Sequence, residues 1–166
     1  MDYTILIDNR EQQNWLDESW KTAHVTLETG DYSIAQSSSL QSKYTDKDLN
    51  HFLCLERKKT VSELAQNLTK SAFKKEIERL ANFKHKFLIL EFSYTDVVNY
   101  PYNSSIPRSR WRKIRVRAPF ILACLSGMMI HSNIQVIFAE NRAGAIAIAS
   151  EIIKRCIKIL EKKENG

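Results

Sequence analysis

Cysteine is scarce in this sequence of 166 residues, and the pattern of its cysteines excludes two classes of protein. Cys54, Cys124 and Cys156 are odd in number, far apart and each surrounded by apolar residues. Such cysteines do not form a disulfide framework and are typical of reduced, buried thiols in an intracellular protein. The four histidines are equally scattered, so the sequence shows no Cys/His spacing of a zinc site.

Long hydrophobic runs are also absent, which argues against a membrane protein. The longest apolar stretch, residues 118–130, contains Ser126 and Gly127 and is shorter than the about 20 residues that a membrane-spanning helix needs. The sequence begins Met-Asp without a basic stretch, so no secretory signal is expected. We therefore expect no membrane association and an intracellular location: cytoplasm or nucleoid in a prokaryote or virus, nucleus in a eukaryote.

Negative charge is under-represented, and one long stretch has none. Lysine and arginine number 25 against 19 acidic residues, a net charge of +6 that indicates a polyanionic partner. Residues 97–139 contain no acidic side chain, and within them lies a basic run around Trp111. Its six cations are Arg108, Arg110, Arg112, Lys113, Arg115 and Arg117.

This basic run has two interpretations. It can follow a DNA backbone, with Trp111 stacked on a base. Alternatively, Trp111 and Ile114 face the core and the cations form a solvated surface. We favour DNA contact for the cations and a core position for Trp111.

Apolar and polar segments alternate in a way that predicts a single α/β domain with a mixed sheet. Residues 24–30 and 31–36 read as a hairpin-like pair, and the Ser-rich stretch 36–50 as a flexible surface connection. Thr60 and Glu63 have capping-box spacing, followed by one helix or two shorter ones. We expect strands at 3–8, 24–30, 31–36, 51–58, 86–92 and 134–138, and further helices from Pro119 to about Ile130 and at 142–160.

Three residues at the ends of predicted strands suggest chemistry. Asp31 follows Gly30, and Glu56 and Lys58 point to one face of a later strand while Arg57 points to the other. If the two strands are neighbours, Asp31 and Glu56 can bind one Mg²⁺ or Mn²⁺ ion. The metal would activate a water, and Lys58 would stabilise charge on a phosphate. The alternative is a surface aspartate beside a solvated strand end.

Four ordered motifs decide between these alternatives: IDNRE (7–11), LETGDY (27–32), LERKKTVSEL (55–64) and FLILEF (87–92). Together they closely resemble the nuclease domain of the XPF/Hef-type structure-specific endonucleases, a branch of the PD-(D/E)xK superfamily. The resemblance covers essentially the whole chain. It implies an α/β, restriction-nuclease-like fold, a central mixed β-sheet flanked by helices, over residues 1–166. The helix-hairpin-helix domain that such enzymes usually carry is not expected here.

The resemblance also implies roles for individual residues. Asp31 and Glu56 would be metal ligands, and Asp8 an additional acidic residue of the metal site. Lys58 would be the catalytic lysine. Arg10 would lie close to the site, and Arg57 would brace the site or a phosphate, unless both arginines only neutralise the acidic cluster. Glu28 would be an auxiliary acid.

Two positions depart from the family pattern. The aspartate expected four residues after Lys58 is Ser62, with Glu63 next to it, so Glu63 either replaces that auxiliary acid or only initiates a helix. The family's Gly-Arg turn between two helices is not evident, and Lys70 and Lys74 are the nearest basic residues. Neither departure affects Asp31, Glu56 or Lys58.

The final predicted helix is apolar around more of its circumference than the about 100° stripe of a surface helix. Deep burial in the monomer is one explanation. We favour a homodimer contact, because XPF-type nuclease domains pair. The two adjoining apolar arcs contain Ile146, Ala149, Ile153, Cys156, Ile157 and Leu160, and Ile148, Ile152 and Ile159.

These observations predict a Mg²⁺- or Mn²⁺-dependent DNA endonuclease that hydrolyses phosphodiester bonds in branched, flapped or forked DNA during repair, recombination or replication. It would act as a homodimer or with a DNA-targeting protein. The alternative is a degenerate nuclease-like module that binds DNA or scaffolds an active partner.

Overall fold

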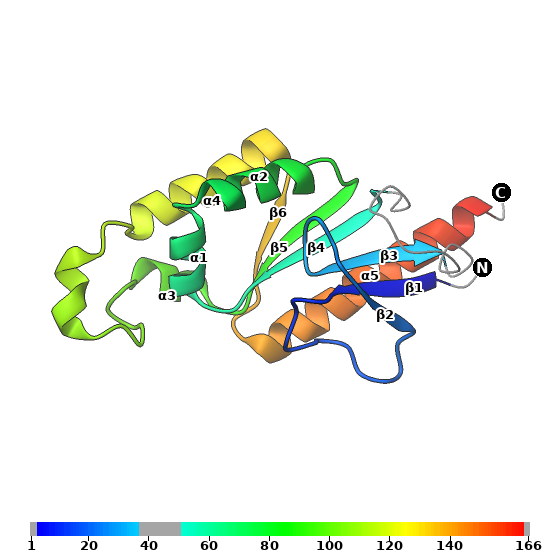
Figure 1. Ribbon diagram of the computed structural model, residues 1–166, viewed down its shortest axis with the longest axis horizontal. Coiled ribbons are helices and arrows are strands. Elements are labelled where there is room, and N and C mark those ends of the chain that lie inside the picture. Colours follow the sequence, from blue (N-terminus) through cyan, green and yellow to red (C-terminus); the bar gives the residue numbers. More distant parts are fainter. Residues whose placement is uncertain (1–2, 37–50, 165–166) are drawn as a thin grey trace.

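The computed structural model describes residues 3–36 and 51–164 and contains one mixed sheet of six strands (Figure 1). Its spatial order is β2-β1-β3-β4-β5-β6. β3 is antiparallel to both of its neighbours, whereas the other adjacent pairs are parallel. The strands are β1 (Tyr3–Asp8), β2 (Thr22–Val25), β3 (Tyr32–Gln36), β4 (Leu53–Lys58), β5 (His85–Leu90) and β6 (Gln135–Phe138).

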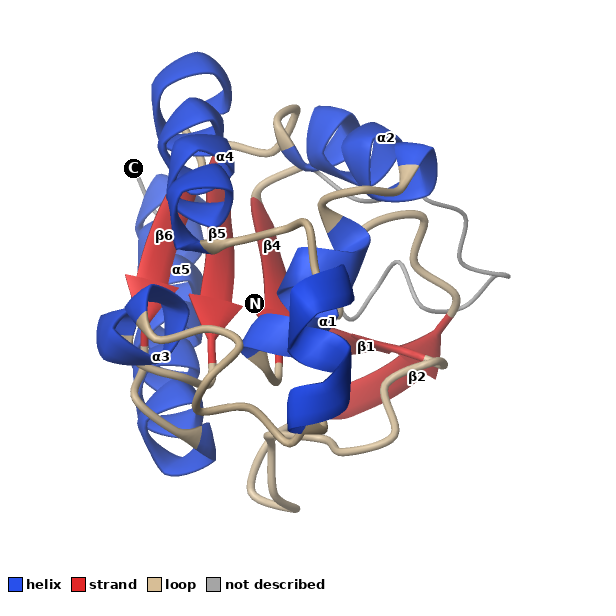
Figure 2. Ribbon diagram, turned by 90° about the vertical axis from the view of Figure 1, so that its left-hand side faces the viewer, coloured by secondary structure: helices blue, strands red, loops and turns tan. Residues whose placement is uncertain are grey.

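Helices cover both faces of the sheet (Figures 1 and 2). The long α5 packs on one face, and α1, α2 and α4 pack on the other. This is the α/β, restriction-nuclease-like arrangement expected from the sequence. The helices are α1 (Val61–Asn67), α2 (Ser71–Leu80), α3 (Tyr94–Val98), α4 (Ala118–Ser132), α5 (Arg142–Glu164) and a 3₁₀ helix, η3 (Arg108–Lys113).

The central strands are apolar throughout because both of their faces are buried. Along β4, Leu53 and Leu55 contact the α5 side, while Cys54 contacts the α1/α2 side. The same alternation sends Arg57 toward α5 and sends Glu56 and Lys58 toward α1 and α2. The two ends of one strand therefore serve different purposes, since its first half builds the core and its second half carries charge.

The predicted hairpin of 24–30 with 31–36 is wrong. β1 lies between β2 and β3, and β2 pairs with β1 in parallel. Residues 26–31 form a loop that crosses the end of β1, where the Leu27 N–H donates to Asp8 Oδ2 at 2.8 Å. Alternation along a strand identifies its buried face but not its neighbour, so the pattern did not reveal the inserted strand.

The predicted helices are confirmed in their main features. Two short helices follow β4, and α4 has Pro119 in its first turn and ends at Asn133 in the left-handed region. Thr60 caps α1 by accepting from the Glu63 N–H at 3.1 Å. The Glu63 carboxylate accepts from the N–H of Lys59, one residue before the cap, at 2.9 Å.

Three further expectations concern single features. Cys54 and Cys156 are buried and Cys124 is half-buried, and all three are free thiols. In the part of the chain that the structure describes, no helix has the length and apolar character that crossing a bilayer requires. The expected surface connection at 36–50 lies, from residue 37 on, outside the described residues.

Candidate active site

The antiparallel pairing of β3 with β4 brings Asp31 beside the charged end of β4. Its N–H donates to the Leu55 carbonyl at 2.8 Å, and its Oδ2 accepts from the Arg57 N–H at 2.7 Å. Gly30 makes this approach possible, because its φ of +77° is a left-handed conformation. A Cβ on Gly30 would lie 2.2 Å from the sulfur of Cys54, so no other residue fits there without movement.

Glu56 and Lys58 lie side by side on the face of β4 that α2 covers. Both are buried, with exposed fractions of 3% and 5%. The Lys58 ammonium contacts Glu56 Oε1 and lies 5.0 Å from the centre of the Phe73 ring. The other carboxylate oxygen, Glu56 Oε2, is buried and has no hydrogen-bond partner. An unpaired buried carboxylate oxygen is costly, so this atom is the main candidate for binding a cation.

The electrostatics of the site oppose the simultaneous ionisation of its two buried carboxyl groups. Burial raises the pKa of Asp31 to about 7, although the Arg57 N–H and the Lys58 ammonium lower it. Burial, followed by the charge of Asp31, raises the pKa of Glu56 well above its usual range. Burial alone would lower the pKa of Lys58, but Glu56 and Asp31 outweigh this effect and raise it. One lysine does not balance two buried carboxyl groups, and a divalent cation would.

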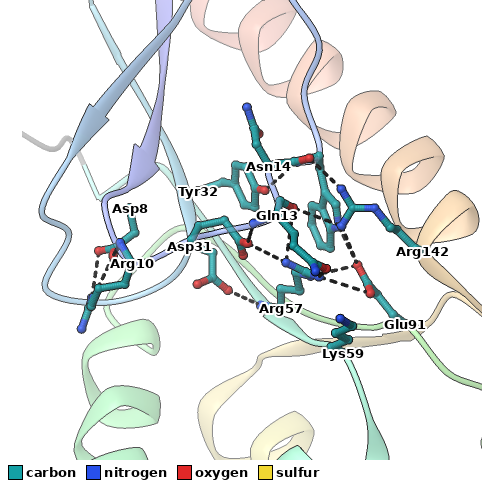
Figure 3. A network of polar contacts seen from close by, with 12 residues as sticks. Asp8, Arg10, Gln13, Asn14, Asp31, Tyr32, Arg57, Lys59, Glu91 and Arg142 are labelled. Carbon is teal, nitrogen blue, oxygen red and sulfur yellow. Dashed lines mark hydrogen bonds and ion pairs between the residues drawn. The ribbon is translucent and has the colours of Figure 1, made fainter.

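Asp8, at the end of β1, is already saturated with hydrogen bonds (Figure 3). Its Oδ1 accepts from Arg10 Nε at 2.7 Å and its Oδ2 from Arg10 Nη2 at 2.8 Å, with further bonds from the N–H groups of Arg10 and Leu27. Burial would raise the pKa of Asp8, but these bonds hold it below its usual range. In this arrangement the Asp8–Arg10 pair secures the loop that precedes Asp31.

Arg57 lies on the opposite face of β4 and is bound by two acidic side chains (Figure 3). Its Nε donates to Glu91 Oε1 at 2.8 Å and its Nη1 to Glu11 Oε1 at 2.7 Å. Trp15 Nε1 also donates to Glu91 Oε1, at 2.7 Å. Because the Arg57 side chain is 7% exposed, it braces the site from within. Of the roles that the sequence left open for Arg57, the geometry favours this one.

The Asp31 side of the site opens into a cavity of about 300 Å³. Lys58 and Glu63 line it, whereas Glu56 is buried and is not one of its lining residues. Ser62 lines a neighbouring hollow instead. Glu63 therefore assists the N-terminus of α1 and also faces the cavity. Glu28 is exposed on the loop before Gly30.

Sequence reasoning assigned no role to three acidic residues near the site. Glu11 and Glu91 lie within the quoted motifs, and a glutamate that follows an otherwise apolar strand is a usable signal for Glu91. Glu76 lies on α2, and its charge raises the pKa of Asp31 and of Glu56. Nothing in the sequence indicates Glu76, because only the packing of α2 brings it near β4.

The residues fit a metal of the Mg²⁺ or Mn²⁺ type in part. Asp31 and Glu56 offer hard oxygen ligands, and the unpartnered Glu56 Oε2 is the atom that needs a cation. Within residues 3–36 and 51–164, no group of three or more His, Cys, Asp or Glu side chains is already arranged to hold a metal ion. Remaining positions would therefore be filled by water or phosphate oxygens, as Mg²⁺ commonly allows.

The basic run includes η3 and lies in a segment that projects from the domain (Figure 1). Contacts among residues of this segment hold it together. Trp111 is half-buried, donates from Nε1 to the Ile106 carbonyl at 2.8 Å and packs edge-on against Tyr102. Arg117 is half-buried and donates to the Trp111 carbonyl at 2.9 Å. Trp111 therefore braces the projection, but it is not part of the buried core, so the core position that we favoured for it is not confirmed, whereas Ile114 does pack against the core. Five cations remain exposed: Arg108, Arg110, Arg112, Lys113 and Arg115.

Fold and site together define an α/β nuclease-type domain whose acidic pair and lysine lie at the ends of adjacent central strands. The chain belongs to the ERCC4-domain family, since the model of the ERCC4 domain matches residues 7–151. The resemblance to XPF-type nucleases is thereby confirmed, and family membership supports a nuclease that acts on DNA. No curated protein matches the chain significantly.

Solved structures support the fold. XPF from Aeropyrum pernix matches with a TM-score of 0.63 and 18% identity, over 98% of this chain and 69% of that one. XPF from the same organism in complex with DNA matches with a TM-score of 0.59 and 18% identity, over 98% of this chain and 66% of that one. The chain therefore spans about two thirds of these relatives.

Proposed function

We propose that this protein is a divalent-metal-dependent DNA endonuclease that hydrolyses phosphodiester bonds. The observation that carries the proposal is the buried oxygen of Glu56 that lacks a partner, next to Asp31 and Lys58. A purely structural glutamate would have both oxygens paired, as Asp8 has. Retained acidic groups with this arrangement favour an active enzyme.

Each residue has a distinct task in this proposal. Asp31 and Glu56 would hold the Mg²⁺ or Mn²⁺ ion, which when bound polarises the phosphate and lowers the pKa of a water. The Lys58 ammonium stabilises the negative charge that develops on the phosphate oxygens. Arg57 fixes the position of Asp31 through its N–H, while its guanidinium is anchored to Glu11 and Glu91.

We further propose that the substrate is branched, flapped or forked DNA. Support comes from the five exposed cations of the basic run and from the related XPF that was solved with DNA. The experiment is cleavage of labelled flap, fork, Holliday and linear DNA with Mg²⁺ or Mn²⁺, with EDTA as control. Cleavage of linear duplex at the same rate as branched DNA would contradict the substrate assignment. That the proposed endonuclease acts in repair, recombination or replication, and that it is intracellular, remain predictions.

One observation favours the alternative, a degenerate module that binds DNA or scaffolds a partner. Both oxygens of Asp8 are occupied by Arg10. DNA binding without cleavage of any of these substrates, in either metal, would select this alternative.

We propose a homodimer, with a DNA-targeting protein as the alternative partner. On α5, Ala149, Ile153 and Cys156 are buried in the monomer, so burial explains much of its wide apolar surface. Ile159 remains exposed, and α4 adds more exposed apolar surface on Phe120, Met129 and Ile130, of which Ile130 is 76% exposed. These exposed apolar side chains on α4 and α5 are the ones on which the proposed homodimer rests.

A further inference from the structure

A second cavity, away from the active site, lies between the C-terminal end of α1 and the basic run. Its volume is about 590 Å³, about twice that of the active-site cavity. Its apolar wall consists of the buried ring of Tyr100 and three half-buried aliphatic side chains, Ile106, Ile114 and Val116. The size falls in the range of small-molecule sites, which span roughly 300–1,000 Å³.

The rim of this cavity is positively charged. Arg110, Lys113 and Arg115 line it with exposed side chains, and none of its lining residues is acidic. Among the residues that the structure describes, none of these three cations forms an ion pair. Cations left free around an apolar wall fit a ligand with a flat apolar body and an attached anion.

The opposite wall supplies polar groups and sets the distance to the active site. Gln66 and Thr69 line the cavity from the end of α1, and this helix begins shortly after Lys58. Seven helical residues span about 10 Å at roughly 1.5 Å per residue. The cavity and the charged end of β4 are therefore linked by this one short helix.

We infer that this cavity binds an unpaired base of single-stranded DNA, with its flanking phosphates on Arg110, Lys113 and Arg115. The apolar wall contacts the face of the base, and Gln66 offers hydrogen bonds to its edge. A base within a duplex is stacked and does not reach the cavity, so the site distinguishes a single-stranded arm from a duplex. The inference rests on the proposed action on DNA and specifies the form of DNA that is recognised.

The test measures binding in EDTA, so that no cleavage is needed. A branched DNA carries one abasic site that is moved along its single-stranded arm. Wild type loses about fivefold or more in affinity at one or two adjacent positions, because stacking of a single base is lost. Gln66→Trp fills the cavity, so it weakens binding of the intact arm and removes the positional effect, while binding of blunt duplex is unchanged. Thr22→Trp, on the far edge strand β2, is the matched control and changes neither.

A charge-matched pair extends the test to the rim. Arg115→Gln and Arg112→Gln each remove one exposed cation of the basic run, but only Arg115 lines the cavity. Arg115→Gln lowers affinity for the single-stranded arm relative to blunt duplex, and Arg112→Gln lowers both equally. A flat abasic profile in wild type, or an unchanged profile in Gln66→Trp, overturns the inference. If wild type shows the expected loss of affinity at one or two abasic positions but cleaves no DNA with Mg²⁺ or Mn²⁺, the inference is upheld and only the nuclease proposal is contradicted.

Discussion

The Lys58 ammonium contacts one oxygen of Glu56 and leaves the other, Oε2, buried without a partner. This pair, in which only one carboxylate oxygen has a partner, makes the active site testable by substitution. Asp31→Asn, Glu56→Gln and Lys58→Ala each remove a metal ligand or a charge that stabilises the transition state, so each should lower single-turnover cleavage by about 100-fold or more. Circular dichroism checks that the fold is intact.

The neighbouring Ser62 provides the control for these variants. It lines a different hollow from the Asp31 cavity, so Ser62→Ala should leave cleavage nearly unchanged. Cleavage by Asp31→Asn at the wild-type rate would mean that the metal does not bind between Asp31 and Glu56.

The buried ion pair of Arg57 with Glu91 should be important for stability. Without Glu91, the buried Arg57 guanidinium keeps Glu11 but loses its second acidic partner, and Trp15 Nε1 loses its acceptor, so the cost should approach the about 3–5 kcal/mol of a broken buried pair. We expect a loss of this size in the free energy of unfolding for Glu91→Ala, measured by urea denaturation. Arg112→Ala removes an exposed arginine instead and should change stability by less than about 0.5 kcal/mol. Equal losses in the two variants would show that Glu91 contributes nothing beyond ordinary surface charge.

Gly30 should be intolerant of even one added methyl group. Gly30→Ala places a side chain in the left-handed region, at about 1–2 kcal/mol, and forces it against the Cys54 sulfur, at about 1–3 kcal/mol. We expect both lower stability and lower cleavage, because Asp31 follows directly. The same substitution in a Cys54→Ala background should cost less, since the steric part is relieved. An identical cost in both backgrounds would assign the effect to the backbone alone.

The basic run should affect binding and not chemistry. Replacing Arg110, Arg112 and Arg115 with Ala should weaken DNA binding and flatten its log–log salt dependence by up to about three units. Cleavage at saturating DNA should survive, because Asp31, Glu56 and Lys58 are untouched. Titrations at several salt concentrations, followed by single-turnover cleavage, separate the two effects. An unchanged slope would reduce the run to a solvated surface.

The proposed dimer should depend on exposed apolar residues. Ile130→Lys with Ile159→Lys should give a monomer in light scattering, because both are exposed apolar side chains on the two helices proposed to form the dimer. Ile152, which the sequence suggested together with Ile159, is half-buried against the core, so its substitution would also destabilise the monomer. Thr22→Lys on β2 is the control. A wild type that is monomeric at high concentration would rule out the homodimer.

Sequence alone predicted the elements that depend on local pattern and motif. Periodicity predicted the apolar strands, and capping chemistry predicted the cap at Thr60. The approach of Asp31 to Glu56 was predicted only on the condition that their strands are neighbours, as β3 and β4 are. The sequence did not reveal that β1 separates β2 from β3, because a strand's alternation is the same whichever neighbour it has. Nor did it identify Glu76 or the pairing of Arg57 with Glu91, since these contacts form only through the packed tertiary structure.

The hydrogen bond from Arg142, on α5, to the carbonyl oxygen of Asn14 joins residues 128 positions apart in sequence. Like the packing of α5 on the sheet that contains β1, this contact forms between segments far apart in the sequence. The segment that carries Glu11 and Trp15 is bound to Arg57, Tyr32 and Glu91, and the last helix adds the Arg142 bonds and covers this face of the sheet. During synthesis the site should therefore assemble late, and a nascent chain that exposes Asp8, Asp31 and Glu56 but not yet α5 should be unable to cut DNA.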